Sequence, residues 1–381
     1  MAGERTIAFV AGEASGDLLA APVVSEIRQR APDTRCVGIG GDRMIAAGFD
    51  VWHHVRELSV RGYVEVLRHL PRLLRLRRTL RERVITTKPL VFVGVDAPDF
   101  NLALEEQLRG QGVRTVHFVS PSIWAWRGER ISQIARAVDR MLLVFPFEQK
   151  IYDDAGIPAS YVGHPLANMI PMIPDAAAAR RRLGLQVEGT LLAVLPGSRP
   201  DEVRHNGPTF VAAMAAVAAE QPQMRFVMPV ADAAFRSTIE QLMAAQPGLA
   251  AKVDIVNGRS HDCLEASDVV LVASGTATLE AALFKRPMVI AYKMSPLTAW
   301  IMWRKGRIPY VGLPNILAGD LVVPELLQHH ATPATLARAV LDWLHDAARR
   351  ERIAARFTEM HHSLTRDTAR LVTDAIFEVA Q

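Results

Sequence analysis

Two aspartates that follow a short apolar run are the strongest candidates for chemistry in this sequence. Asp96 and Asp99 come directly after residues 90–95, and Pro98 between them ends an extended strand. Asp99 stands where it can cap a helix that begins near Asn101, whereas Asp96 has no such structural task. A carboxylate at the C-terminal end of a strand can accept a proton from a substrate hydroxyl group. Asp96 is therefore our first candidate for a general base, and Asp99 is the second.

A segment with two glycines, residues 11–17 (AGEASGD), follows the first apolar run of the chain. The glycines allow a tight turn, and the N-terminus of the helix that we expect next can accept an anion or sugar hydroxyl groups. The spacing matches neither the dinucleotide motif GxGxxG nor the hydrolase motif GxSxG. From the spacing alone, Asp17 is best explained as the cap of this helix.

A turn in the second half of the chain is a candidate phosphate site. In residues 195–199 (LPGSR), the amide of Ser198 and the guanidinium group of Arg199 can bind phosphate oxygens. A turn that merely contains an arginine explains this segment equally well.

A second candidate phosphate site follows the buried run 269–273. This run carries Ser274, Gly275 and Thr276 to the start of a helix, where free amides and the helix dipole favour a diphosphate. Glu280 lies four residues after Thr276, one too many for a capping box, and can bond a ribose diol. The alternative is that Thr276 only caps the helix and that Glu280 only complements its dipole.

Metal and disulfide chemistry find little support in the sequence. There is no DxD triplet, HExxH or CxxC motif, so we expect neither a metal site nor a cofactor, with arginine and a helix dipole stabilising a leaving diphosphate instead. The two cysteines, Cys36 and Cys263, lie far apart in apolar stretches and are expected to be buried free thiols.

An arginine- and leucine-rich segment, residues 66–83, has the pattern of a helix that lies in an anionic lipid interface. An ordinary surface helix that packs its leucines on a sheet is the alternative, and Pro71 indicates a helix break or start. Nucleic acid is a poorer explanation, because leucines and not aromatic residues separate the arginines. The residues that we expect at the membrane are Arg68, Arg72, Leu73, Arg75, Leu76, Leu80, and, beside a second basic cluster, Trp300 and Trp303.

The elements that must position these residues alternate along the chain. Of the 381 residues, 50% are hydrophobic and 22% are charged, with a net charge of +4, which excludes a disordered chain and favours two hydrophobic cores. Short β-branched runs alternate with helical patterns, as in parallel sheets covered on both faces. The sequence therefore predicts an α/β protein with two Rossmann-like, doubly wound domains that face a cleft. We expect strands at 6–10, 35–39, 90–95, 115–119, 141–145, 191–195, 225–230, 252–256, 269–273 and 288–291, and helices at 17–29, at 101–111 and after 333.

The expected domains are residues 1–170 and residues 171–350. The proline-rich stretch 164–174 is the expected linker between them, and residues 351–381 form C-terminal helices. No run is long enough to span a bilayer, and no signal-peptide pattern opens the sequence, so we expect a cytoplasmic protein.

Seven motifs in order resemble the lipid-A-disaccharide synthase family, whose members are inverting glycosyltransferases of the two-domain GT-B architecture. The motifs are residues 12–17 (GEASGD), 95–101 (VDAPDFN), 119–126 (VSPSIWAW), 162–164 (VGH), 195–199 (LPGSR), 273–280 (ASGTATLE) and 313–319 (LPNILAG). The resemblance implies transfer of 2,3-diacylglucosamine from its UDP form to 2,3-diacylglucosamine 1-phosphate, which gives the β-1,6-linked disaccharide phosphate and UDP. It implies work at the inner face of the inner membrane, and it leaves open a homodimer and a C-terminal helix that returns to the first domain or exchanges between chains.

The resemblance also implies that residues 1–170 hold the acceptor and face the membrane and that residues 171–350 hold the nucleotide sugar. It implies roles for individual residues too. Asp96 would take the proton of the acceptor hydroxyl group, and Asn315 would face the nucleotide. The residues expected to bind the UDP-sugar are Ser198, Arg199, Ser274, Gly275, Thr276, Glu280 and Asn315, and those expected on the acceptor side are Glu13, Ser15, Gly16 and Asp17.

Two alternatives remain at this point. The first is another GT-B enzyme that uses UDP-GlcNAc, either a transferase or a 2-epimerase, although such enzymes should lack residues 120–126 and the arginine-rich helix. The second is a non-catalytic peripheral membrane protein that binds acylated sugars.

Overall fold

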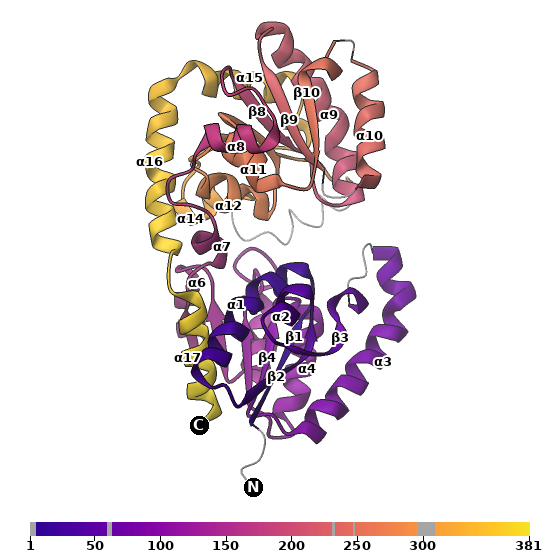
Figure 1. Cartoon of the computed structure of the whole chain (residues 1–381), viewed down its shortest axis with the longest axis vertical. Coiled ribbons are helices and arrows are strands. Elements are labelled where there is room, and N and C mark those ends of the chain that lie inside the picture. The colour runs from indigo at the N-terminus through magenta and orange to yellow at the C-terminus, as the bar shows by residue number, and fades with distance from the viewer. Residues whose placement is uncertain (1–4, 59–62, 231–232, 247, 296–308) are drawn as a thin grey trace. The chain divides into compact units, whose positions relative to one another are not determined.

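The computed structural model describes residues 5–58, 63–230, 233–246, 248–295 and 309–381, and within these ranges it leaves the side chains of 63–70 and 233–234 undescribed. The chain forms two compact units. One contains residues 1–165 together with 364–381, and the other contains residues 166–363 (Figure 1).

The described part of the first unit is built on a parallel sheet with the strand order β3-β2-β1-β4-β5-β6-β7. The order reverses beside β1, as in a doubly wound fold, so the connections after β1 and after β4 cover opposite faces. The strands are β1 (Arg5–Ala11), β2 (Thr34–Gly40), β3 (Asp50–His54), β4 (Val91–Val95), β5 (Thr115–Phe118), β6 (Arg140–Leu143) and β7 (Ala159–Tyr161).

Helices cover both faces of this sheet. The C-terminal helix packs beside α1, whereas α3 packs beside α4 over a core of alternate strand residues (Figure 1). The helices are α1 (Ala14–Arg30), α2 (Asp42–Ala46), α3 (Tyr63–Thr87), α4 (Pro98–Arg109), α5 (Ile131–Ala137), α6 (Glu148–Asp154) and α17 (Thr368–Ala380). Short 3₁₀ turns lie at Val55–Glu57 and Gly128–Arg130. The prediction of a helix break or start at Pro71 was wrong, because α3 runs through this residue.

The second unit repeats the architecture with the strand order β10-β9-β8-β11-β12-β13 in its described part. The strands are β8 (Leu191–Leu195), β9 (Arg225–Val230), β10 (Val253–Asn257), β11 (Val269–Ala273), β12 (Met288–Tyr292) and β13 (Glu325–Leu327). The helices are α7 (Pro165–Met169), α8 (Ala176–Leu183), α9 (Pro200–Glu220), α10 (Ala233–Ala244), α11 (Ser260–Ala266), α12 (Thr276–Leu283), α14 (Leu313–Ala318), α15 (Pro333–His345) and α16 (Ala347–Leu364), with 3₁₀ turns at Ala250–Lys252 and Gln328–His330.

Two doubly wound parallel sheets confirm the predicted fold class, and each predicted strand corresponds to an observed strand. Both cysteines are buried and free, as expected, and burial raises the pKa of the Cys36 and Cys263 thiols to about 12. The expected linker 164–174 contains the short helix α7.

Candidate active site

The loops after β1 and β4 lie in contact at the C-terminal edge of the first sheet. A β-carbon on Gly12 would lie 2.0 Å from the Ala97 side chain, and one on Gly16 would lie 3.3 Å from the Val95 carbonyl oxygen. The glycines therefore let the turn before α1 approach the residues around Asp96. Glu13, in this turn, and Ser15, in the first turn of α1, are exposed.

Asp17 performs a different structural task from the expected one. The prediction that it caps its own helix was wrong, because α1 begins at Ala14 and Asp17 lies inside it. Its carboxylate is only 5% exposed and accepts the backbone N–H groups of Gly41, Arg43 and Met44 at 2.7, 3.1 and 3.0 Å. It thus satisfies the free amides at the start of α2.

Asp96 follows β4 with a left-handed backbone, at φ 54°, and Ala97 is left-handed too, at φ 44°. The Asp96 side chain is partly exposed and makes no hydrogen bond or ion pair with the residues that the structure describes. A carboxylate at a strand end with no partner is available to accept a proton.

Asp99 differs from Asp96 in its position in the fold and in its partners. It lies within the first turn of α4, which begins at Pro98 with Ala97 as its N-cap, so the predicted capping role of Asp99 was wrong. Its carboxylate forms ion pairs with Arg130 and, at 3.4 Å, with Arg127. These arginines already occupy the carboxylate, so Asp96 is the better candidate base.

The loop after β5 is held by a buried acid that sequence reasoning missed. Glu148, 1% exposed, accepts the Trp124 indole N–H and the Phe145 amide, each at 3.1 Å. Ser120, in the same loop, bonds the Tyr152 hydroxyl group at 2.6 Å. Burial raises the pKa of Glu148 to about 7 despite these donors. The acid lies in the segment after β6, and nothing in its local sequence marks it.

In the second unit, a carboxylate of the protein occupies the first candidate phosphate site. Glu202 accepts the amides of Ser198 and Arg199 at 2.9 and 3.3 Å, and its other oxygen pairs with the Arg199 guanidinium group at 2.8 Å. A β-carbon on Gly197 would lie 2.3 Å from the Glu202 β-carbon, so the glycine allows this approach. An anion at these amides would have to displace Glu202.

The turn before α12 is open. The N-cap is Gly275, exposed and at φ 155°, with no atom within 4 Å of the position of a β-carbon, and Thr276 is the first helical residue. Thr276 therefore does not cap the helix. Ser274 donates its hydroxyl group to the Val311 carbonyl oxygen at 2.9 Å. The Thr278 amide donates to the Gly275 carbonyl oxygen at 3.1 Å, whereas the amides of Thr276 and Ala277 have no partner among the residues that the structure describes. Two such amides at a helix start are the geometry that binds a diphosphate.

Glu280 has a partner that the sequence did not suggest. Its carboxylate lies 3.6 Å from Nε2 of His261, on α11, and the carboxylate raises the pKa of His261. The side chain is 17% exposed, so one face remains accessible.

Asn315, which the resemblance places toward the nucleotide, lies in α14 and is 0% exposed. Its amide group donates to the Val323 carbonyl oxygen and to Glu325, and its oxygen accepts the amides of Val322 and Val323. Because every donor and acceptor of this side chain is used, Asn315 acts by ordering the segment next to Ser274.

Among the described side chains of α3, those at 71–75 are mostly exposed, whereas Leu76, Leu80 and Val84 pack on the core. Arg72 and Arg75 are exposed, and Leu73 is partly exposed. Leu80 is 1% exposed inside the core, so the prediction that it contacts the membrane was wrong, whereas Leu76 is partly exposed and packs against that core. The side chain of Arg68, and Trp300 and Trp303, lie outside the described residues.

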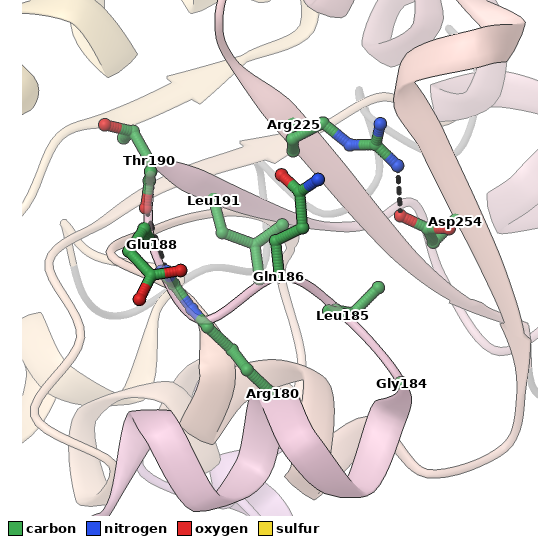
Figure 2. Close-up of a pocket in the computed structure, with 10 residues that line it drawn as sticks. Arg180, Gly184, Leu185, Gln186, Glu188, Thr190, Leu191, Arg225 and Asp254 are labelled. Carbon is green, nitrogen blue, oxygen red and sulfur yellow. Dashed lines mark hydrogen bonds and ion pairs between the residues drawn. The ribbon is translucent and has the colours of Figure 1, made fainter.

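A pocket of about 240 Å³ lies at the opposite, N-terminal edge of the second sheet (Figure 2). It is lined where β8 and β9 begin. Arg225 bonds Asp254 at 3.0 Å, and Arg180 bonds Asp268 and the carbonyl oxygens of the loop before β8, so both arginines are paired within the protein. This pocket has a structural explanation and is not part of the candidate site.

In the part of the chain that the structure describes, no helix is long and apolar enough to cross a bilayer, and no group of three or more metal-binding side chains is assembled.

Comparison with known proteins identifies close relatives. A family model described as lipid-A-disaccharide synthetase matches residues 7–376. The lipid-A-disaccharide synthase of Paraburkholderia phytofirmans is 54% identical over 376 residues, which are 98% of this chain and 96% of the relative. A calicheamicin glycosyltransferase structure matches with a TM-score of 0.63 at 15% identity, over 99% of this chain and 98% of that one. The UDP-GlcNAc 2-epimerase from Neisseria meningitidis, bound to UDP-GlcNAc, matches with a TM-score of 0.62 at 10% identity, over 98% and 100%. At these low identities, the two matches show only that this chain shares their fold.

Proposed function

The chain belongs to the lipid-A-disaccharide synthase family, and we propose that its two units divide one glycosyl transfer between them. The second unit holds UDP-2,3-diacylglucosamine, and the first unit activates the acceptor, 2,3-diacylglucosamine 1-phosphate. The observation that carries this assignment is the partly exposed carboxylate of Asp96 at the end of β4, which has no partner in the part of the chain that the structure describes.

The reaction is a single displacement at C1 of the donor sugar. Asp96 removes the proton of the acceptor hydroxyl group. At the same time the hydroxyl oxygen forms the new bond to C1, and the bond from C1 to the diphosphate oxygen breaks. The electron pair of that bond leaves with UDP. The amides at Thr276 and the dipole of α12 stabilise the developing charge, and Ser274 and Gly275 shape their approach.

The remaining site residues have supporting roles in this proposal. Glu280, held by His261, bonds the ribose, and Arg199 pairs with the diphosphate once Glu202 releases the Ser198 loop. Glu13, Ser15 and Gly16 border the acceptor, whereas Asp17 and Asn315 order the segments that carry the contacts.

Release of UDP from UDP-diacylglucosamine, measured with and without the acceptor, tests the function. Release that depends on the acceptor supports a transferase, whereas turnover without it supports an epimerase or hydrolase, and no turnover supports a binding protein. Asp96→Asn should lower turnover by about 10²- to 10⁴-fold and leave UDP binding intact. Asp99→Asn is the matched control, and near-normal turnover of Asp96→Asn would remove this residue as the base.

We also propose that the protein acts at the surface of an anionic membrane, on the cytoplasmic face. Because α3 follows β3, its first half starts near the C-terminal edge of the sheet, on the side of the acceptor loops. There Arg72 and Arg75 are exposed, and Leu74 is 46% exposed. Anionic lipid headgroups attract such a basic face, and an exposed leucine can enter the interface.

Flotation with anionic vesicles at rising salt tests this proposal. The double variant Arg72→Glu/Arg75→Glu should no longer float with the vesicles at low salt. Arg114→Glu, which changes an exposed arginine beside the N-terminal end of β5, should still float with them. Equal flotation of the two variants would count against α3 as the contact.

A homodimer that exchanges C-terminal helices remains a prediction. Within one chain α17 already packs on α1 and on β4, so an exchange would replace contacts that the single chain makes. Light scattering of the protein in detergent decides between one chain and two.

A further inference from the structure

Three buried polar side chains contact one another or the strand ends next to Asp96, and they have no part in the mechanism given above. They are Asn101 and Glu105, four residues apart on α4, and His117, on β5. Each of the three is 0% exposed. Residues four apart on a helix share a face, so Asn101 and Glu105 present their side chains to the same strands.

Asn101 holds the backbone of the candidate base. Its Nδ2 donates to the Asp96 carbonyl oxygen at 2.8 Å and to the Val10 carbonyl oxygen at 3.2 Å, so one amide group ties the ends of β4 and β1 together. The Asp96 amide donates to the Phe118 carbonyl oxygen at 2.9 Å, which adds a tie to β5.

These ties matter because the backbone at this point is strained. Asp96 and Ala97 are successive non-glycine residues at positive φ. Such a conformation costs about 1 to 2 kcal/mol per residue and persists only where the surroundings impose it. In the left-handed conformation, the Asp96 side chain leaves the backbone in a different direction from the side chain of a residue in extended conformation.

Glu105 and His117 support the same strand end from below. The Nδ1 atom of His117 lies 2.8 and 3.0 Å from the two carboxylate oxygens of Glu105. A β-carbon on Gly94 would lie 2.1 Å from a Glu105 oxygen, so only glycine fits two residues before Asp96. Gly94 is also the register partner of His117 in the sheet.

Burial of the Glu105–His117 pair costs desolvation free energy, because both side chains are removed from water. Burial raises the pKa of the Glu105 carboxyl group. Within the described residues, Nε2 of His117 and Oδ1 of Asn101 also lack hydrogen-bond partners. Apolar side chains would fill the same space at lower cost, so the polar groups call for a role beyond packing.

We propose that Asn101, Glu105 and His117 are positioning residues that hold Asp96 in its left-handed conformation and aim its carboxylate at the acceptor hydroxyl group. This role rests on the proposed function, in which Asp96 is the general base. Asn101 fixes the Asp96 carbonyl group directly. The Glu105–His117 pair fixes the strand two residues earlier, so that a shift at His117 reaches the base through Gly94.

Two substitutions of His117 separate positioning from packing. In His117→Asn, the amide nitrogen takes the place of Nδ1 and can still donate to Glu105, whereas His117→Leu leaves the carboxyl group without a donor. A displacement of the base by about 1 Å lowers the rate by about 100-fold, so we expect that loss in kcat for His117→Leu, with KM for both substrates within about threefold. His117→Asn should keep kcat within about fivefold of the parent.

The measurements are kcat and KM of acceptor-dependent UDP release, the acid limb of the kcat profile against pH, and the folded fraction by near-ultraviolet circular dichroism. The acid limb should move in His117→Leu and stay in His117→Asn, because only the former changes the surroundings of Asp96. Equal kcat per folded molecule in the two variants would overturn the proposal, as would losses confined to melting temperature.

Asp96→Asn is measured alongside. If it keeps turnover, the proposed base is wrong whatever the His117 variants do. If it is inactive while His117→Leu is fully active, only the positioning role fails. Should His117→Leu not fold, Asn101→Ala replaces it at the other end of the chain of contacts, with the same expected loss of kcat and the same unchanged KM.

Discussion

Glu148 offers a test of the structure that needs no substrate. The acid is 1% exposed, and burial raises its pKa from 4.5 to about 7. Because the folded state binds this proton more tightly than the unfolded chain does, the protonated acid favours folding. The contribution is fully present below about pH 4.5 and is lost as the pH rises towards 7.

The size of the effect follows from the shift. A change from 4.5 to about 7 corresponds to about 3 kcal/mol of unfolding free energy, and about 2 kcal/mol of it is lost between pH 5 and pH 8. Glu148→Gln cannot lose a proton. The unfolding free energy of this variant, taken relative to the wild type, should therefore rise by about 2 kcal/mol from pH 5 to pH 8.

Urea unfolding at several pH values, followed by tryptophan fluorescence, measures this difference. Trp124 donates to Glu148, so its emission should also titrate near pH 7 in the wild type and not in the variant. Glu129→Gln, at an exposed glutamate beside the same loop, is the control and should show no trend. A flat difference for Glu148→Gln, or one that falls with pH, would refute the reasoning.

Four further substitutions test the assignments of individual residues. Asp17→Ala leaves three amides of α2 without an acceptor and should lower the unfolding free energy by about 3 kcal/mol, seen as a lower melting temperature of the unit. Leu80→Ala should cost about 2 to 5 kcal/mol in urea unfolding and leave flotation on anionic vesicles unchanged. Asn315→Ala should cost about 2 to 4 kcal/mol, and a loss of UDP affinity without a loss of stability would contradict its buried position. Glu202→Gln weakens the competitor at the Ser198 loop, so calorimetry should show tighter UDP binding, whereas weaker binding would assign Glu202 to the ligand.

The strands were predictable where they were buried on both faces. Continuous β-branched runs such as 91–95 and 269–273 can form little else between turn signals. The strands β3, β7 and β13 were missed because they are short, lie at or near sheet edges and are only partly buried, so their sequences DVWHH, ASY and ELL carry no apolar run.

The candidate site was predictable in its positions and not in its partners. Loops at the C-terminal ends of strands follow from the fold class alone, which is why Asp96 and the turn at Gly275 were found. The acceptors and donors that meet those loops come from distant segments, as Asp17 meets Gly41 and Glu280 meets His261. Helical periodicity could not assign Leu80 either, because a leucine that faces a sheet and one that faces lipid recur at the same spacing.

The contacts of the carboxylates near the C-terminal edge of the first sheet indicate which of them can act as a base. Among the described carboxylates near the first edge, Asp17 caps α2, Asp99 binds arginines and Glu148 holds the Trp124 loop. A group already engaged in such contacts must break them before it can act, and the cost falls on the transition state. Asp96 carries no such cost.

The same reasoning orders the two phosphate candidates in the second unit. The amides of Ser198 and Arg199 are occupied by Glu202, so a diphosphate gains there only what exceeds the bonds it replaces. Beside the exposed Gly275, the amides of Thr276 and Ala277 are free of partners within the described residues, and a ligand gains their full interaction. Binding should therefore begin at α12, and the Ser198 loop should engage only once the diphosphate is already held, which makes Arg199 a group whose contribution can grow as the sugar leaves.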